Sequence, residues 1–293
     1  MQETVLVSVI VPVWNDLQRI GTCIDALKKQ QFSYGQFEII VVDNGSTDGT
    51  YDLIKTVSNI VPLQEVKPGS YAARNCGLSV AKGEYVAFTD SDCVPDTMWL
   101  GKLYESAKKQ KNFGVVAGDV VFFSPATSRI EQSALDFENM FSMNQKHNSE
   151  NGVSITANWL SKMETILHFG MFDSNLKSGG DHALSKKMSQ QGFPVIFSKN
   201  AVVKHPARNI AEIVSKRKRV IGGSWQRQVG RFKGVAIMYA SIKLLIKRCL
   251  ITLSNRPLPV QRKFKLIGLL FRIFTTSMKE VCRLMSGANP SRQ

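Results

Sequence analysis

Three short apolar runs, each rich in β-branched residues, limit the fold of this 293-residue chain more than any other feature. They cover Val7–Val13, Glu38–Val42 and Tyr85–Thr89. Runs that are apolar almost throughout are typical of strands buried on both faces of a parallel sheet. Apolar residues make up 43% of the chain, which is enough for a buried core and argues against disorder.

Between these runs the apolar residues recur at helical spacing. Ile20, Ile24 and Leu27 precede the second run, and Tyr51 and Ile54 follow it. The order strand, helix, strand, helix predicts an α/β fold with a doubly wound, mostly parallel sheet flanked by helices. Because ligands of such sheets bind beyond the carboxyl ends of the strands, the residues that follow each strand are the first candidates for a site.

Polar residues follow all three runs. Pro12 and Asn15 lie at the end of the first, Asp43 opens a turn rich in Asn, Gly and Ser after the second, and Asp90-Ser91-Asp92 follows the third. Asp90 and Asp92, one residue apart and without a positive neighbour in sequence, suit a divalent cation with hard ligands such as Mg²⁺ or Mn²⁺. The alternative for this pair is a solvated surface turn.

Four more residues are candidates, each with a structural alternative. Asp43 fits a ligand contact or a turn cap, and Arg74, in a stretch predicted to be helical, fits a diphosphate contact or a surface salt bridge. Asp181 follows two glycines at the expected start of a helix, where it is either an N-cap or an ionised proton acceptor. His205 follows a further strand-like run and is either a metal ligand or a packed side chain.

Positive charge is concentrated at the C-terminal end. The whole chain carries a net charge of +15, but residues 201–293 hold 20 basic and 2 acidic side chains, a net of +18. We therefore expect two domains, residues 1–209 and a basic helical tail over residues 210–293. In the last apolar stretch, basic residues recur at helical spacing and form one stripe: Lys265, Arg272, Lys279 and Arg283.

A helix with such a stripe predicts attachment to an anionic membrane surface. Its apolar face is formed by Ile267, Leu270, Phe271, Phe274, Met278 and Val281. The alternative is that this face packs against the rest of the chain or a second subunit. Five cysteines without a close pair, and no apolar run of about 20 residues, favour a cytoplasmic protein that is peripheral on the cytosolic side of the membrane.

Four segments together resemble glycosyltransferase family 2, the inverting nucleotide-sugar transferases of the GT-A fold. The resemblance covers about residues 7–206. The matching segments are VSVIVPVWN, VVDNGSTDGT from Val41, AARNCGLSVAKGEYVAFTDSDC ending at Cys93, and NWLSKMETILHFGMFDSNLKSGGDHAL ending at Leu184. Their common order and spacing make the resemblance specific, although each segment alone is only moderately so.

The resemblance implies a role for each candidate near the donor. Pro12 and Asp43 would line the pocket for the nucleobase and ribose, and Arg74 would lie near the nucleotide. Asp92 would be the more direct ligand of Mn²⁺ or Mg²⁺, with Asp90 closer to the ribose.

The resemblance also implies the remaining two roles. Asp181 stands at the position of the catalytic base, and His205 matches a less regular histidine that approaches the metal or diphosphate in some relatives. Gly180 departs from the pattern, because many members carry an acidic residue there. What that extra carboxylate does is therefore absent here or supplied by another residue.

These roles imply transfer of a sugar from a UDP- or GDP-linked donor to a hydroxyl of a glycan or lipid-linked acceptor, with inversion at the anomeric carbon. The tail lacks the Q-x-x-R-W motif of processive synthases, which favours transfer of a single sugar.

A nucleotidyltransferase is one alternative, but it would normally carry a Gly-rich basic loop near its N-terminus. A nucleic-acid-binding protein would explain the tail but not the strand-end aspartates, so we expect no nucleic-acid partner. A catalytically inactive relative is a further alternative.

Overall fold

The computed structural model describes residues 5–125, 129–176 and 178–289. These residues form two compact units. The first runs up to Val121 and resumes from Met143 to His205, and the second contains Phe122–Ser142 and the described chain from Pro206 onward. The domain boundary after residue 209 stays a prediction, and the grouping of residues 122–142 with the tail was not predicted from the sequence.

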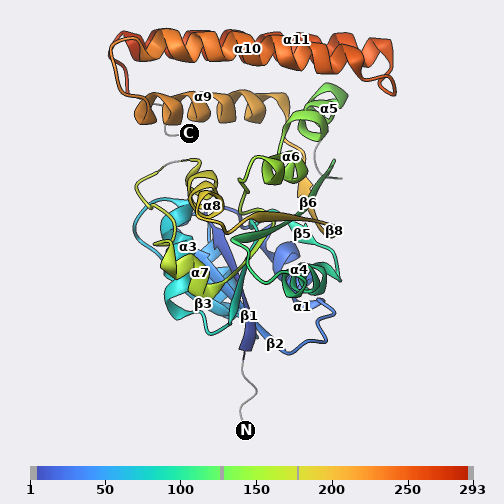
Figure 1. The fold of residues 1–293 in the computed structure, drawn as a ribbon, viewed down its shortest axis with the longest axis vertical. Coiled ribbons are helices and arrows are strands. Elements are labelled where there is room, and N and C mark those ends of the chain that lie inside the picture. The colour runs from blue at the N-terminus through green and yellow to red at the C-terminus, as the bar shows by residue number, and fades with distance from the viewer. Residues whose placement is uncertain (1–4, 126–128, 177, 290–293) are drawn as a thin grey trace. The chain divides into compact units, whose positions relative to one another are not determined.

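Strands and helices alternate through the first half of the chain, as the apolar runs predict (Figure 1). In chain order the elements up to the sixth strand are β1 Val5–Val13, α1 Ile20–Lys28, β2 Gln36–Asp43, α2 Thr50–Thr56, β3 Val61–Gln64, α3 Ser70–Val80, β4 Tyr85–Phe88, β5 Val94–Pro95, α4 Trp99–Lys108 and β6 Val115–Phe123. The remaining elements are α5 Gln132–Phe141, α6 Gln145–Glu150, β7 Trp159–Lys162, α7 Met163–His168, α8 Gly180–Gln190, β8 Val195–Pro206, α9 Ile210–Arg227, α10 Lys233–Ser254 and α11 Val260–Met285.

One sheet holds eight strands in the order β3-β2-β1-β4-β7-β6-β8-β5. The three predicted strands, β2, β1 and β4, lie next to one another and pair in parallel, and β3 extends this parallel part. Strand β7 pairs antiparallel with both β4 and β6, and β5 pairs antiparallel with β8. The α/β fold class with a mostly parallel sheet and flanking helices is confirmed, whereas the antiparallel pairings carry no signal in the local sequence.

The register of the parallel strands positions the polar residues that follow them. Val13 pairs with Asp43, so β1 and β2 end at the same level. Phe88, the last residue of β4, pairs with Ile10, three residues before the end of β1. The residues after β4 therefore continue beside the end of β1. This arrangement gathers three polar segments at one edge of the sheet, as expected for parallel strands.

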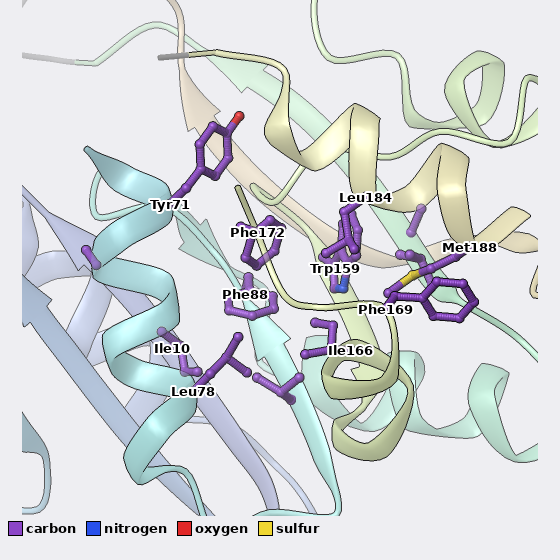
Figure 2. Packing of buried hydrophobic residues seen from close by; sticks show 14 of the residues in the cluster. Ile10, Tyr71, Leu78, Phe88, Trp159, Ile166, Phe169, Phe172, Leu184 and Met188 are labelled. Atoms are coloured by element: carbon purple, nitrogen blue, oxygen red, sulfur yellow. The ribbon is translucent and has the colours of Figure 1, made fainter. Parts of the chain in front are cut away.

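Buried aromatic and aliphatic side chains join the sheet to α3, α7 and α8. Figure 2 shows part of this cluster, with Phe88 and Trp159 from the sheet among side chains of the three helices. Phe172 packs edge-on against Phe88 at 5.3 Å between ring centroids and stacks with Tyr71 at 5.7 Å. Tyr71 lies near the start of α3, so the cluster fixes the position of that end of the helix.

The second unit is mainly helical, and its helices pack in part through ion pairs. Glu138 of α5 is 1% exposed and pairs with Arg208 at 3.3 Å, and Asp136 pairs with Arg262 of α11. The apolar side chains of its larger buried cluster are Ala134, Phe137, Ile213, Leu266, Leu269, Leu270 and Ile273. The predicted helical tail is confirmed. Among the described residues we find no helical segment with the length and hydrophobicity that a bilayer span requires.

Candidate active site

The two aspartates after β4 lie beside His205. Because β5 follows them directly and pairs with β8, with Val94 opposite Lys204, the end of β8 is brought to the Asp90-Ser91-Asp92 turn. The Nε2 atom of His205 lies 3.5 Å from Oδ1 of Asp92. Asp90, Asp92, Cys93 and His205 each offer one ligand atom, and these atoms lie within 4.8 Å of one another.

This donor set suits a hard divalent cation. Two carboxylates and an imidazole are ligands that Mn²⁺ and Mg²⁺ accept. Cys93 is a soft ligand, and burial raises the pKa of its thiol well above its usual value, which keeps the sulfur protonated. The residues fit a cation held by the aspartates and the histidine, as the sequence pattern predicts.

Each aspartate of the turn also has a cationic neighbour from elsewhere in the chain. Arg74 donates from one terminal nitrogen to Oδ1 of Asp90 at 2.6 Å, and Arg19 approaches Oδ2 of Asp92 at 3.7 Å. The two aspartates have no positive neighbour in sequence, and the fold supplies one to each of them. Each carboxylate of the turn thus has one guanidinium neighbour, and Asp92 also lies beside His205.

Asp16 is a buried member of the site that the sequence analysis did not identify. Its carboxylate accepts from the Ser91 hydroxyl at 2.6 Å and from Nε of Arg19 at 2.5 Å. Burial raises the pKa of Asp16, and the hydrogen bonds from Ser91 and Arg19 oppose this rise. Asp16 thus ties Arg19 to the Asp90-Ser91-Asp92 turn. It lies three residues after the end of β1, so reading that strand end one residue past Asn15 would have included it.

Asp43 lies at the end of β2, fully buried, beside the end of β1, where Pro12 is also buried. Its Oδ2 accepts from the backbone N–H groups of Gly45 and Ser46, both at 3.1 Å. Among the described residues, Oδ1 of Asp43 is a buried oxygen without a hydrogen-bond partner. A buried acceptor of this kind is costly unless a ligand donates to it.

The turn after Asp43 is joined to the start of α3. Asn44 accepts from the backbone N–H of Gly69 at 2.6 Å and donates to the backbone carbonyls of Glu65 and Lys67. Gly69 precedes α3 with a φ of 131°, a conformation that glycine adopts readily. The Asp43 turn and the first turn of α3 therefore hold one another in place.

Asp181 lies in the first turn of α8, where its negative charge is favoured by the helix N-terminus. The helix cap is Gly179, so the N-cap alternative for Asp181 is wrong. The carboxylate accepts from the hydroxyl of Tyr71 at 3.1 Å and from two backbone N–H groups, those of His182 at 2.9 Å and Thr156 at 3.4 Å. These donors hold a half-buried carboxylate in one orientation.

Helix α3 links the Asp43 turn, the Asp90-Ser91-Asp92 turn and Asp181. Its N-terminal end contacts the Asp43 turn through Gly69, its Tyr71 bonds to Asp181, and its Arg74 bonds to Asp90. Tyr71 and Arg74 are three residues apart and so share a face of the helix, with the guanidinium 5.8 Å from the centroid of the Tyr71 ring. Carboxylates that are far apart in sequence thus belong to one connected set of side chains.

A family model described as "Glycosyl transferase family 2" matches residues 8–166, more than half of the chain. The chain belongs to glycosyltransferase family 2. The suspected resemblance is confirmed, and the enzyme class is glycosyltransferase. Membership favours this class over the nucleotidyltransferase and nucleic-acid-binding alternatives.

Named relatives share much of this chain. It is 32% identical to glycosyltransferase AglE of Haloferax volcanii over 75% of its own length and 73% of that protein. It is 33% identical to the Escherichia coli UDP-Glc:alpha-D-GlcNAc-diphosphoundecaprenol beta-1,3-glucosyltransferase WfaP, over 43% of this chain and 47% of WfaP.

Two solved structures share the fold. The mannosyltransferase PcManGT of Pyrobaculum calidifontis, in complex with GDP-Man and Mn²⁺, aligns with a TM-score of 0.59 and 18% identity. That alignment covers 96% of this chain and 88% of PcManGT. S. aureus TarS in complex with UDP aligns with a TM-score of 0.54 and 18% identity, over 97% of this chain and 92% of the TarS chain. Because the identity is low, these two structures show only that this family 2 member has the GT-A fold.

Proposed function

We propose that this glycosyltransferase moves a single sugar from a nucleoside-diphosphate sugar to a hydroxyl group, with inversion of the anomeric carbon. The observation that carries the proposal is the connection of Asp43, the Asp90-Ser91-Asp92 turn and Asp181 through the first two turns of α3. A nucleoside-diphosphate sugar has three consecutive parts, the nucleoside, the diphosphate and the sugar, and it needs a group of the site beside each of them.

Asp43 and Pro12 would take the nucleoside. The buried, unpartnered Oδ1 of Asp43 fits an N–H of a base or a hydroxyl of a ribose, because either would satisfy it. UDP and GDP are both candidates, since PcManGT holds GDP-Man, TarS holds UDP and WfaP is named for UDP-Glc. Asp90 would lie near the ribose, held there by Arg74.

Asp92, with Asp90 and His205, would hold the metal ion. A divalent cation bound there supplies positive charge to the diphosphate that leaves. The Mn²⁺ of PcManGT supports manganese or magnesium in this role. Arg19 and Arg74 add two guanidinium groups on the same carboxylates, so the site carries cationic side chains of its own beside the leaving group.

Asp181 would act as the base for the acceptor. The acceptor hydroxyl oxygen forms a bond to the anomeric carbon while the bond from that carbon to the diphosphate oxygen breaks, and its electron pair leaves with the diphosphate. The hydroxyl proton passes to the Asp181 carboxylate, which its three donors hold in one orientation. A single displacement from the opposite face inverts the configuration and needs no nucleophilic side chain.

The acceptor we propose is a glycan precursor, in particular a saccharide linked to a lipid diphosphate. The name of WfaP supports this class, because its acceptor is a sugar on diphosphoundecaprenol. Transfer of one sugar per acceptor is favoured because the tail reads Trp225-Gln226-Arg227-Gln228 rather than the processive motif.

A screen of UDP- and GDP-sugars with Mn²⁺ or Mg²⁺, read as release of free sugar or as transfer to lipid-linked saccharides, tests the proposal. We expect one nucleotide class to be turned over, and Asp181→Asn to lower turnover by about 10²–10⁴-fold with donor binding retained. The matched control is Asp52→Asn, which changes a carboxylate that is 80% exposed on α2. Turnover by Asp181→Asn at the wild-type rate would exclude Asp181 as the base.

A further inference from the structure

Helices α10 and α11 carry rows of exposed apolar side chains that the packing of their unit does not use. On α10 the row consists of Val235, Tyr239, Ile242, Ile246, Leu250 and Leu253, which are each 43–59% exposed. Their spacing of three or four residues places them on one face of the helix. The opposite face is occupied, since Ile237, Ser241 and Thr252 are buried.

Helix α11 repeats this division. The apolar face that the sequence assigns to it is only partly used internally, because Leu270 and Val281 are buried while Phe271 is 51% exposed. Phe271 belongs to a row of exposed apolar side chains that also includes Val260 at 66% and Phe264 at 71%. Helices α10 and α11 pack against each other and are joined by a short connection, and they overlap in the view of Figure 1.

Exposed cations lie beside both rows. On α10, Lys243 and Lys247 directly follow Ile242 and Ile246 and are therefore displaced by about 100° around the helix. On α11, cations directly follow Phe264, Phe271 and Met278 in the same way; these are Lys265, Arg272 and Lys279.

Carboxylates are nearly absent from these two helices. The single acidic residue of α10 and α11 is Glu280, which is 4% exposed and bonded to Arg283. The apolar rows and their flanking cations thus face solvent without a competing negative side chain from either helix.

We propose that the exposed rows of α10 and α11 dock on a bilayer that contains anionic lipid. Aliphatic and aromatic side chains enter the boundary between headgroups and acyl chains, and the adjacent lysines and arginines contact the anionic headgroups. A second copy of this chain is a poorer occupant, because it would place lysines and arginines against their equivalents. A nucleic acid would leave the apolar rows against solvated phosphates. The proposal does not depend on the transferase reaction.

Flotation of the 293-residue protein with phosphatidylcholine vesicles, with or without about 30 mol% phosphatidylglycerol, tests the docking surface. We expect binding to the anionic vesicles that falls as salt rises. The double variant Lys243→Gln/Lys247→Gln should weaken it by roughly 10- to 30-fold, and Ile246→Ser/Leu250→Ser should also weaken it. The matched control Lys109→Gln/Lys111→Gln changes two exposed lysines of the first unit and should bind like wild type.

Three outcomes would overturn the membrane proposal. One is binding that does not depend on anionic lipid or is absent. Another is wild-type binding by both double variants on α10. The third is a stable dimer, measured by light scattering without vesicles, that Ile246→Ser/Leu250→Ser dissociates, because the rows would then be an interface between copies.

A separate observation concerns the environment of Asp181. The Tyr71 hydroxyl accepts from the backbone N–H of Gly180 at 2.9 Å and donates to Asp181 at 3.1 Å. A Cβ atom at position 180 would lie 2.8 Å from Cε2 of Tyr71, so the phenol ring occupies the space of a side chain there. In Figure 2 the ring lies at the edge of the aromatic cluster, with its hydroxyl directed away from the other labelled side chains.

We infer that Tyr71 is the positioning residue for Asp181 in this chain, with its ring in the space that a side chain at position 180 would take. This inference rests on the proposed role of Asp181 as base. The hydroxyl both stabilises the ionised carboxylate and fixes its orientation. Burial, and then the charge of Asp181, raise the pKa of Tyr71, which keeps the phenol protonated as a donor. The other charged or titratable neighbours are Arg74 across the ring and His182 next to Asp181.

The variant Tyr71→Phe keeps the ring and removes the hydroxyl. We expect kcat to fall by about 10-fold with the KM for donor unchanged, and the acidic limb of the pH profile to move to higher pH, because the carboxylate loses a donor. Adding Tyr71→Phe to Asp181→Asn should cost nothing further. A loss of packing alone would lower stability without moving that limb.

The experiments distinguish a failure of the positioning role of Tyr71 from a failure of the proposed base Asp181. If Asp181→Asn abolishes transfer while Tyr71→Phe has the wild-type rate and pH profile, the positioning role is wrong and the proposed function stands. If Asp181→Asn is fully active, the proposed base is wrong and the role of Tyr71 falls with it.

Discussion

At the scale of residues, the two carboxylate oxygens of Asp43 have different environments. Oδ1 of Asp43 is buried without a partner, while Oδ2 of the same carboxylate is bonded to two backbone N–H groups. One oxygen therefore serves the turn and the other remains for a ligand. In the Asp90-Ser91-Asp92 turn, the guanidinium groups of Arg19 and Arg74 lie beside two carboxylates that would otherwise repel each other.

The substitution Asp43→Asn separates these two uses. The asparagine oxygen can still accept from Gly45 and Ser46, but its NH₂ group would replace the unpartnered acceptor with a donor. Losing a hydrogen bond to a charged group costs about 1.5–3 kcal/mol, so we expect nucleotide affinity to fall by about 10- to 150-fold. Calorimetric titration with UDP and GDP measures the change, and thermal unfolding should show a stable protein. Unchanged nucleotide affinity would contradict the role of Asp43.

Sequence analysis found the acidic members of the site because each follows a strand or opens a helix. It did not find Asp16, Arg19 or Tyr71. Asp16 bonds to Ser91, which is 75 residues away in sequence, and Tyr71 bonds to Asp181, which is 110 residues away. No local pattern carries such distances, although Asp16 lies close enough to the end of β1 to have been considered.

At the scale of elements, the first two turns of α3 and the residue before them, Gly69, have the greatest influence on the site. They contact the Asp43 turn, Asp181 and Asp90 through three separate hydrogen bonds. Gly69 sets the starting direction of the helix, with a φ of 131° and no heavy atom within 4 Å of the place a Cβ would take. A substitution there strains the backbone without a steric clash.

We therefore expect Gly69→Ala to cost about 1–3 kcal/mol of stability through backbone strain and to lower nucleotide affinity as well, because the Asp43 turn shifts with α3. Denaturant unfolding and nucleotide titration measure the two effects. Gly170→Ala is the matched control, since Gly170 also has a positive φ of 87° and open space around its Cβ position. It should lose similar stability and keep its affinity. Equal affinity in both variants would show that α3 does not position the nucleotide site.

Elements with a strong local period were predictable, and those defined by distant pairing were not. The apolar runs gave β1, β2 and β4, and the helical spacing gave α1, α2 and the helical tail. The short β5 has two residues and exists through its pairing with β8, and α5 joins the second unit through Asp136 and its partner 126 residues away, Arg262. Both features depend on contacts that the local sequence does not reveal.

At the scale of the whole molecule, the carboxylates of the candidate site and the excess of positive charge lie in different parts of the chain. The carboxylates of the site belong to the first unit, and the excess of positive charge belongs to the tail. We propose that the carboxylates of the first unit form the donor site. The proposed bilayer contact gives the positive charge a purpose that the sugar transfer alone does not require.

Metal-dependent nucleotide binding tests the central claim most directly, namely that Asp92 and its neighbours form one donor site. Titration with UDP and GDP, with and without Mn²⁺, should show that one nucleotide binds more tightly when Mn²⁺ is present. Asp92→Asn should abolish this metal dependence, and Asp52→Asn should preserve it. Nucleotide binding by Asp92→Asn that strengthens with Mn²⁺ as much as in the wild type would contradict the account.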